Sequence, residues 1–210
     1  MGSPPRGAPQ TLDATPFANE RAALSPDGLR LVVVNADGQG FSELTRPAGG
    51  TFGAPSAGAF SNLNAQGALG AGESYGDPIL SSDDRTFYYS RYGGGRTQTI
   101  FQTGRLFSGD AWSVATTPAS SATQLMGQAG GDAGVLRRRP TGISADEQTL
   151  FYWDEVTSTE HAAWVGSSGD FETFAVLGSR SGAEPNLGCT ALYHSAGGAS
   201  SVDLFKSTRN

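Results

Sequence analysis

Cysteine, methionine and histidine are scarce in this chain of 210 residues, with one, two and two copies, respectively. The single Cys189 excludes an intramolecular disulfide, and the two histidines lack the close spacing that favours a metal site. Basic residues are also in deficit, because 14 Lys and Arg face 20 Asp and Glu and give a net charge of −6. This charge disfavours nucleic acids and anionic membrane surfaces as partners.

Long apolar segments are missing as well. No run of 18 apolar residues occurs, so the sequence predicts no membrane-spanning helix. Residues 1–7 carry Pro and Gly but no apolar core, and we interpret them as a tag or linker. Residues 8–210 are then expected to form one domain.

Glycine, by contrast, is abundant, with 30 residues. A Gly-rich chain with β-prone segments is typical of many short strands joined by turns. One segment occurs three times, each time with an apolar residue, Ser and Asp placed just before a β-prone run. The three copies are LSPDGLRLVVV (Leu24–Val34), LSSDDRTFYYS (Leu80–Ser90) and ISADEQTLFYW (Ile143–Trp153).

Turn chemistry accounts for the repeated pattern. Asp in a tight turn bonds nearby backbone N–H groups, and Gly28 suits the left-handed conformation that ends such a turn. Asp84 and Glu147 replace this glycine in the later copies, so we expect those turns to differ in type. We interpret the turn aspartates as structural, with Ca²⁺ binding as the alternative and no other cofactor expected. These residues are Asp27, Asp83 and Asp146.

The spacing of the copies predicts the architecture. The turn aspartates are 56 and 63 residues apart, and each period holds about four short strands, as in a propeller blade. A degenerate fourth copy, Cys189–Arg209, lacks the turn and stops before an outer strand. We predict an all-β propeller of four blades with about four antiparallel strands each. The ring would close by pairing of Ala8–Leu12 with the last blade near Asp203–Arg209.

The segments NERAALSPDGLRL (Asn19–Leu31), GDAWS (Gly109–Ser113) and VDLFKSTR (Val202–Arg209) carry a family resemblance. Together they resemble the WD-like repeats of TolB-type β-propellers, whose blades carry SPDG before the second strand. The resemblance covers essentially all residues from Ala8 on and implies the fold without a particular activity. We expect a periplasmic or secreted location, with the export signal removed.

Charged residues precede proline at the expected entry to three inner strands. The residue before proline is held extended, so we expect these groups, with Glu20 nearby, to surround the mouth of a central channel. They would hold a small polar ligand or a cation; the alternative is a ring of mutually paired charges. The residues are Glu20, Asp77, Arg139 and Glu184.

Further candidates lie in the loops that we assign to the same face, where function concentrates on a rigid scaffold. We expect Tyr92 to be exposed in a loop and Trp164, inside a β run, to lie in the core. No set of metal ligands is predicted. The loop-face candidates are Tyr75, Tyr92, Arg96, His161 and His194.

No nucleophile with a positioned base and no carboxylate pair across a cleft is evident. We therefore predict a non-catalytic recognition or scaffold domain that binds a protein, glycan or small polar ligand at its loop-rich face. The alternative is a hydrolase or lyase acting on a carbohydrate or peptide at the channel mouth, with Glu20, Asp77 or Glu184 working beside Arg139. A ring completed by a second chain stays open as an alternative.

Overall fold

The computed structural model describes residues 22–65, 69, 72–93, 96–113, 117–118, 138–154, 157–167, 171–178, 181–185, 191–196 and 203–208. These residues form four antiparallel sheets, one short helix, α1 (Ser61–Ala65), and a 3-10 turn, η1 (Gly58–Phe60). The all-β prediction is therefore confirmed. Within these ranges no helix is long and apolar enough to span a membrane.

The first two sheets follow the hairpins that the repeats predict. The first sheet contains β1 (Ala23–Leu24), β2 (Arg30–Val34) and β3 (Phe41–Thr45), in that order. Beyond β3, Glu43 pairs with Ser56 and extends the sheet by a single bridge. The second sheet contains β4 (Glu73–Leu80), β5 (Thr86–Gly93), β6 (Arg96–Gly104) and β7 (Thr117–Pro118).

The last two sheets have the same order. The third sheet contains β8 (Arg138–Ile143), β9 (Thr149–Asp154), β10 (Thr159–Val165) and β11 (Phe171–Gly178). The fourth sheet contains β12 (Ser181–Pro185), β13 (Ala191–Ala196) and β14 (Asp203–Thr208). Strands β13 and β14 lie within the degenerate fourth repeat, Cys189–Arg209, and β12 precedes it.

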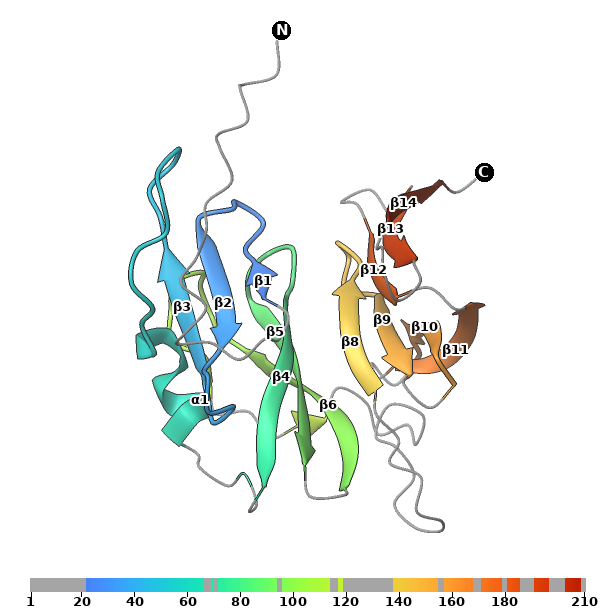
Figure 1. Ribbon diagram of the computed structural model, residues 1–210, viewed down its shortest axis with the longest axis horizontal. Coiled ribbons are helices and arrows are strands. Elements are labelled where there is room, and N and C mark those ends of the chain that lie inside the picture. The colour runs from blue at the N-terminus through green and yellow to red at the C-terminus, as the bar shows by residue number, and fades with distance from the viewer. Residues whose placement is uncertain are drawn as a thin grey trace, which may run out of the picture.

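The sheets succeed one another in chain order, and each sheet contacts the first strand of the next sheet (Figure 1). Strand β2 contacts β4, β4 contacts β8, and β8 contacts β12. This is how the inner strands of propeller blades are arranged. The predicted closing segment, Ala8–Leu12, lies outside the described residues.

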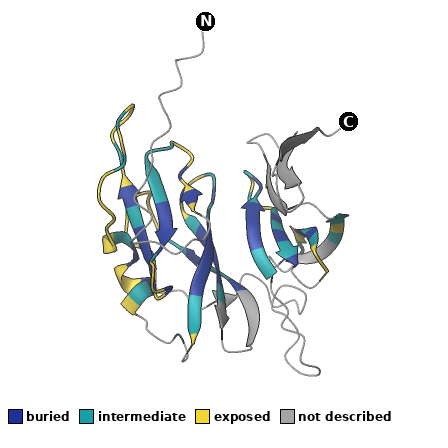
Figure 2. Cartoon of the chain, in the orientation of Figure 1, coloured by how far each residue is buried: buried dark blue, intermediate teal, exposed yellow. Residues whose placement is uncertain are grey.

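Two apolar layers hold the first three sheets together (Figure 2). Because side chains alternate along a strand, Phe87 and Tyr89 of β5 pack toward the first sheet, where the ring of Phe87 lies 4.9 Å from that of Phe41. Tyr88 points the other way and packs with Leu150 of the third sheet. Each such buried side chain stabilises the fold by about 1.5–3 kcal/mol.

The prediction that Trp164 lies in the core is wrong. Trp164 is 39% exposed, whereas its neighbour Ala163 is fully buried in the layer between the second and third sheets. Successive residues of β10 point to opposite faces. The small residue therefore occupies the inward position, and the large one faces away from this layer.

The three Ser-x-Asp turns share one geometry. In each turn the Ser hydroxyl donates to the Asp carboxylate at 2.6, 2.7 and 2.6 Å. The same carboxylate accepts a backbone N–H two residues further on, and the Ser Oγ accepts another five residues on. These are the bonds that the structural interpretation of the turn aspartates predicts, and they lower the pKa of Asp27 and Asp146.

The expected difference in turn type is wrong. The fourth turn position is left-handed in all three copies, with φ of 70° at Gly28, 58° at Asp84 and 56° at Glu147. This conformation costs a residue with a side chain roughly 1–2 kcal/mol. Asp84 offsets this cost through its ion pairs with Arg30 and Arg105, whereas Glu147 has a hydrogen bond with Thr86.

Candidate functional site

The loop end of the second sheet carries a cross-strand ion pair. Glu73 is the first residue of β4, and its Oε2 lies 3.0 Å from Nη2 of Arg91 on β5. The two side chains are 15% and 28% exposed, respectively, and the guanidinium of Arg91 also lies 5.3 Å from the centre of the Phe101 ring. Both charges are therefore held in place while remaining accessible at this end of the sheet.

The third sheet carries an equivalent pair with the charges exchanged. Arg138 begins β8, Asp154 ends β9, and Nε lies 3.2 Å from Oδ2. The two side chains are only 11% and 6% exposed. Asp154 stands eight residues after its turn aspartate, as Arg91 does in the second copy. Adjacent sheets thus present a cation and an anion at the same position of the repeat.

His161 lies beside the second of these pairs. Its ring stacks on Tyr152 at 4.9 Å with an interplanar angle of 13°, and its Nε2 lies 2.8 Å from Oγ1 of Thr159. Burial lowers the pKa of His161, although Asp154 works in the opposite direction. A neutral imidazole near the start of β10 therefore lies beside the Arg138–Asp154 pair at pH 7.

Asp77, a predicted channel-mouth residue, is fully buried. Its Oδ2 accepts a hydrogen bond of 2.7 Å from the Ser90 hydroxyl. Ser90 alternates with Tyr88 on β5, so this contact lies on the face that packs against the third sheet. The expected extended backbone before proline is wrong here, because Asp77 has φ of 48° within a bulge of β4.

The other channel-mouth residues are placed less completely. Arg139 lies on β8 opposite Trp153, and Glu184 lies on β12 opposite Tyr193. Because β4, β8 and β12 are successive neighbours, the fold brings together the three strands that carry Asp77, Arg139 and Glu184. Glu20 lies outside the described residues. Ligand binding by this set stays a prediction.

All five loop-face candidates, Tyr75 in β4 and His161 in β10 included, lie in strands. Tyr92 is in β5 rather than in an exposed loop, Arg96 begins β6, and His194 is in β13. Tyr75 belongs to the core, because it is 5% exposed and its ring lies 5.1 Å from that of Phe41. Burial also raises the pKa of Tyr75. The strands extend further into the expected loops than turn residues alone indicate.

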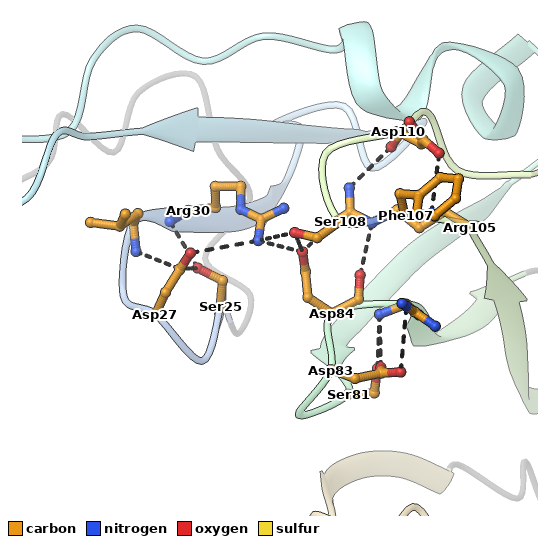
Figure 3. A network of polar contacts seen from close by, with 12 residues as sticks. Ser25, Asp27, Arg30, Ser81, Asp83, Asp84, Arg105, Phe107, Ser108 and Asp110 are labelled. Atoms are coloured by element: carbon orange, nitrogen blue, oxygen red, sulfur yellow. Dashed lines mark hydrogen bonds and ion pairs between the residues drawn. The ribbon is translucent and has the colours of Figure 1, made fainter.

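A polar network at the opposite end of the sheets was not predicted (Figure 3). The carboxylate of Asp84 pairs with Arg30 of the first sheet and with Arg105 at the end of β6, and it accepts a hydrogen bond of 2.7 Å from Ser108. The side chains of Arg30 and Arg105 are 12% and 1% exposed. Arg105 also lies 4.2 Å from the Trp112 ring centre. This network joins two sheets.

One signal for that network was present in the sequence. An arginine follows the turn aspartate by 19 residues in the first copy and by 22 in the second. The structure gives both the same contact, since Nε of Arg46 donates to the carbonyl of Gly28 at 2.7 Å and Nε of Arg105 to that of Asp84 at 2.8 Å. Val165 occupies the matching place in the third sheet.

Ca²⁺ binding stays a prediction, and it concerns the acidic residues in the part of the chain that the structure describes. There, no three His, Cys, Asp or Glu side chains lie close enough together to hold an ion. The turn carboxylates are instead occupied by hydroxyl and backbone donors.

Two solved structures share this arrangement of sheets. A chain assigned as TolB from Agrobacterium tumefaciens matches with a TM-score of 0.54 and 12% sequence identity, over 90% of this chain and 57% of its own length. TolB from Acinetobacter baumannii matches with a TM-score of 0.50 and 12% identity, over 89% of this chain and 40% of its own. No family model and no curated protein matches the sequence. The fold is thus similar to that of β-propellers, and the chain spans about half the length of these TolB chains.

Proposed function

We propose that the chain is a four-bladed propeller module, closed by its N-terminal segment, that binds a protein, glycan or small polar ligand at its loop-rich face. The observation that carries this proposal is the pair of ion pairs of exchanged polarity, Glu73–Arg91 and Arg138–Asp154. They occupy the loop ends of adjacent sheets. A periplasmic or secreted location belongs to the same proposal.

Partly buried charges suit recognition of polar groups. A ligand site needs a few polar groups whose positions are fixed, because ordering them on binding costs free energy. The side chains of Arg91 and Arg138 are 28% and 11% exposed and are anchored by their carboxylate partners. Since neighbouring sheets offer both signs of charge, a ligand that carries donors and acceptors side by side, such as a peptide or a glycan, meets a complementary group on each.

The enclosed position of Asp77 supports recognition rather than hydrolysis. A general acid or base must come within hydrogen-bond reach of the substrate. The Asp77 carboxylate is fully buried and accepts a hydrogen bond from Ser90. Of the three acids proposed for the hydrolase alternative, Asp77 is therefore the one that a substrate would not reach.

Peptide and glycan arrays probed with the labelled wild-type chain test the proposal. For a hit, Arg91→Ala and Arg138→Ala should each weaken binding about tenfold, which is 1.4 kcal/mol. Arg85→Ala is the matched control, because Arg85 is an exposed cation in the turn at the opposite end. Circular dichroism should show that all three variants stay folded.

Equal binding by the wild type and both loop-end variants would overturn the assignment of this face. Cleavage of an arrayed peptide or glycan by the wild type would instead support the enzyme alternative. An array without any hit would also count against a peptide or glycan ligand.

A further inference from the structure

We propose that the opposite end of the molecule carries a second docking surface, centred on Leu106 and Phe107, for a protein segment with apolar side chains and basic flanks. These consecutive residues are 79% and 66% exposed. They follow β6, whose last residue, Gly104, pairs with Thr86 just after the second Ser-x-Asp turn. The surface therefore lies at the turn end, away from the loop-rich face.

The turn that presents these side chains is held rigidly (Figure 3). The Phe107 N–H donates to Oδ2 of Asp110 at 3.1 Å, and the Asp110 N–H donates back to the Phe107 carbonyl at 3.1 Å. Two further hydrogen bonds tie the turn to the polar network of Asp84. Arg105 donates to the Asp110 carbonyl at 3.0 Å, and the Ser108 hydroxyl donates to the Asp84 carboxylate. A partner that binds here would pay little to order the turn, which favours affinity.

The equivalent turns of the other sheets form without large apolar residues at the positions of Leu106 and Phe107. The corresponding turn of the first sheet has exposed Pro47 and Ala48, closed by a 2.9 Å bond from the N–H of Gly50 to the Pro47 carbonyl. After β10, the third sheet continues with Gly166 and Ser167. Exposing Leu and Phe gains no burial energy, whereas anchors of this kind are typical of interfaces.

The charges around Leu106 and Phe107 indicate the chemistry of the partner. Four exposed aspartates lie in the described turns of this end, against a single exposed arginine, Arg85. Arg30 and Arg105 are withdrawn from the surface, since both are engaged with Asp84. An acidic border disfavours nucleic acid, anionic lipid and a second copy of the same surface, and it favours basic side chains. The four are Asp27, Asp83, Asp110 and Asp146.

A fluorescent amphipathic helical peptide built only from Leu and Lys is the probe. Its anisotropy should show binding to the wild type that weakens with added salt. The double variant Leu106→Ser, Phe107→Ser should bind at least about tenfold more weakly. Val176→Ser is the matched control, because Val176 is an equally exposed apolar residue, at 63%, on β11. Its affinity should stay at the wild-type value.

Each other result overturns the proposal. If the wild type does not bind the peptide, or if the double variant and Val176→Ser bind it equally, no specific apolar anchor exists at this turn. If sedimentation shows a wild-type dimer that Phe107→Ser converts to monomer, the surface is a contact between copies instead. Because all the substituted residues are exposed, the urea midpoints should be unchanged. Ligands of the loop-rich face should bind the double variant normally, so the two proposals fail separately.

Discussion

The substitutions Asp84→Gly and Glu147→Gly should change stability in opposite directions, although the two residues occupy equivalent turn positions. Both are left-handed, with φ of 58° and 56°, so glycine relieves about 1 kcal/mol of backbone strain at either position. The difference lies in the side chains. One carboxylate is the partner of two arginines, and the other lies next to another acid.

The loss at Asp84 follows from its burial. Its side chain is 6% exposed and pairs with Arg30 and Arg105, the latter only 1% exposed. Removing one partner of a buried ion pair costs about 3–5 kcal/mol, because the remaining charge is left without compensation. After relief of the strain, we expect Asp84→Gly to lower the unfolding free energy by about 2–4 kcal/mol.

The gain at Glu147 has a different origin. Burial raises the pKa of Glu147, and repulsion from Asp83 adds to this effect, although a hydrogen bond with Thr86 opposes it. The ionised side chain is therefore disfavoured in the folded state at pH 7. Loss of the Thr86 bond costs about 1 kcal/mol, so Glu147→Gly should be neutral or should stabilise by up to about 1 kcal/mol.

Urea unfolding, followed by both tryptophan fluorescence and circular dichroism, measures the two changes, and equal slopes would show that the denatured state is unaffected. Asp84→Asn is the control, because asparagine has the size of aspartate and also tolerates the left-handed backbone, but it carries no charge. This variant should also destabilise the folded protein. The reasoning fails if Asp84→Gly costs less than about 1 kcal/mol, or if Glu147→Gly destabilises as much as Asp84→Gly.

Three further changes test the turns and the arginine that caps them. Ser144→Ala removes the hydroxyl that donates to Asp146 and accepts from the Thr149 N–H. Urea unfolding should show that the unfolding free energy falls by about 1–2 kcal/mol. An unchanged urea midpoint would contradict the role of the hydroxyl. Because the pKa of Asp146 is lowered below its usual 3.8, the stability it contributes is present above that pH and is lost as pH falls through the folded value. Urea midpoints measured from pH 6 downward should therefore fall more steeply for the wild type than for Asp146→Asn, and parallel curves would refute this. Arg105→Lys keeps the charge but removes the guanidinium that lies over the Trp112 ring. It should alter tryptophan emission and cost about 1–2 kcal/mol, whereas identical spectra would exclude the contact.

The repeated hairpins were predictable because the bonds that hold the turns are local. A Ser and an Asp two residues apart supply the hydroxyl and the carboxylate, and the β-prone run begins directly afterwards. The left-handed backbone of Glu147 was not predictable, because its hydrogen bond with Thr86 comes from the preceding sheet. Local propensity disfavours glutamate there, and tertiary contacts override it.

The candidate site was predicted only in part, for a related reason. The sequence identified the end of the sheets where loops and charges gather, but not which strand residues pair across it. Glu73 and Arg91 are diagonal neighbours across β4 and β5, because Glu73 pairs with Gly93 and Tyr75 pairs with Arg91 in a register that shifts after Gly76. A bulge also places Asp77 at φ of 48° instead of extended. Tyr75 was expected at the loop face and is in the core, because its strand begins at Glu73, five residues before Pro78.

The contacts of the left-handed turn residues also bear on how a repetitive chain avoids misassembly. Asp84 reaches back to Arg30, and Glu147 reaches back to Thr86, which follows its own turn aspartate by three residues, as Arg30 does. A swap that packed the third sheet against the first would separate Asp84 from Arg30 and remove one of the two arginine partners of this buried carboxylate. Similar hairpins are thereby made non-interchangeable, and the correct succession of sheets is favoured over its permutations.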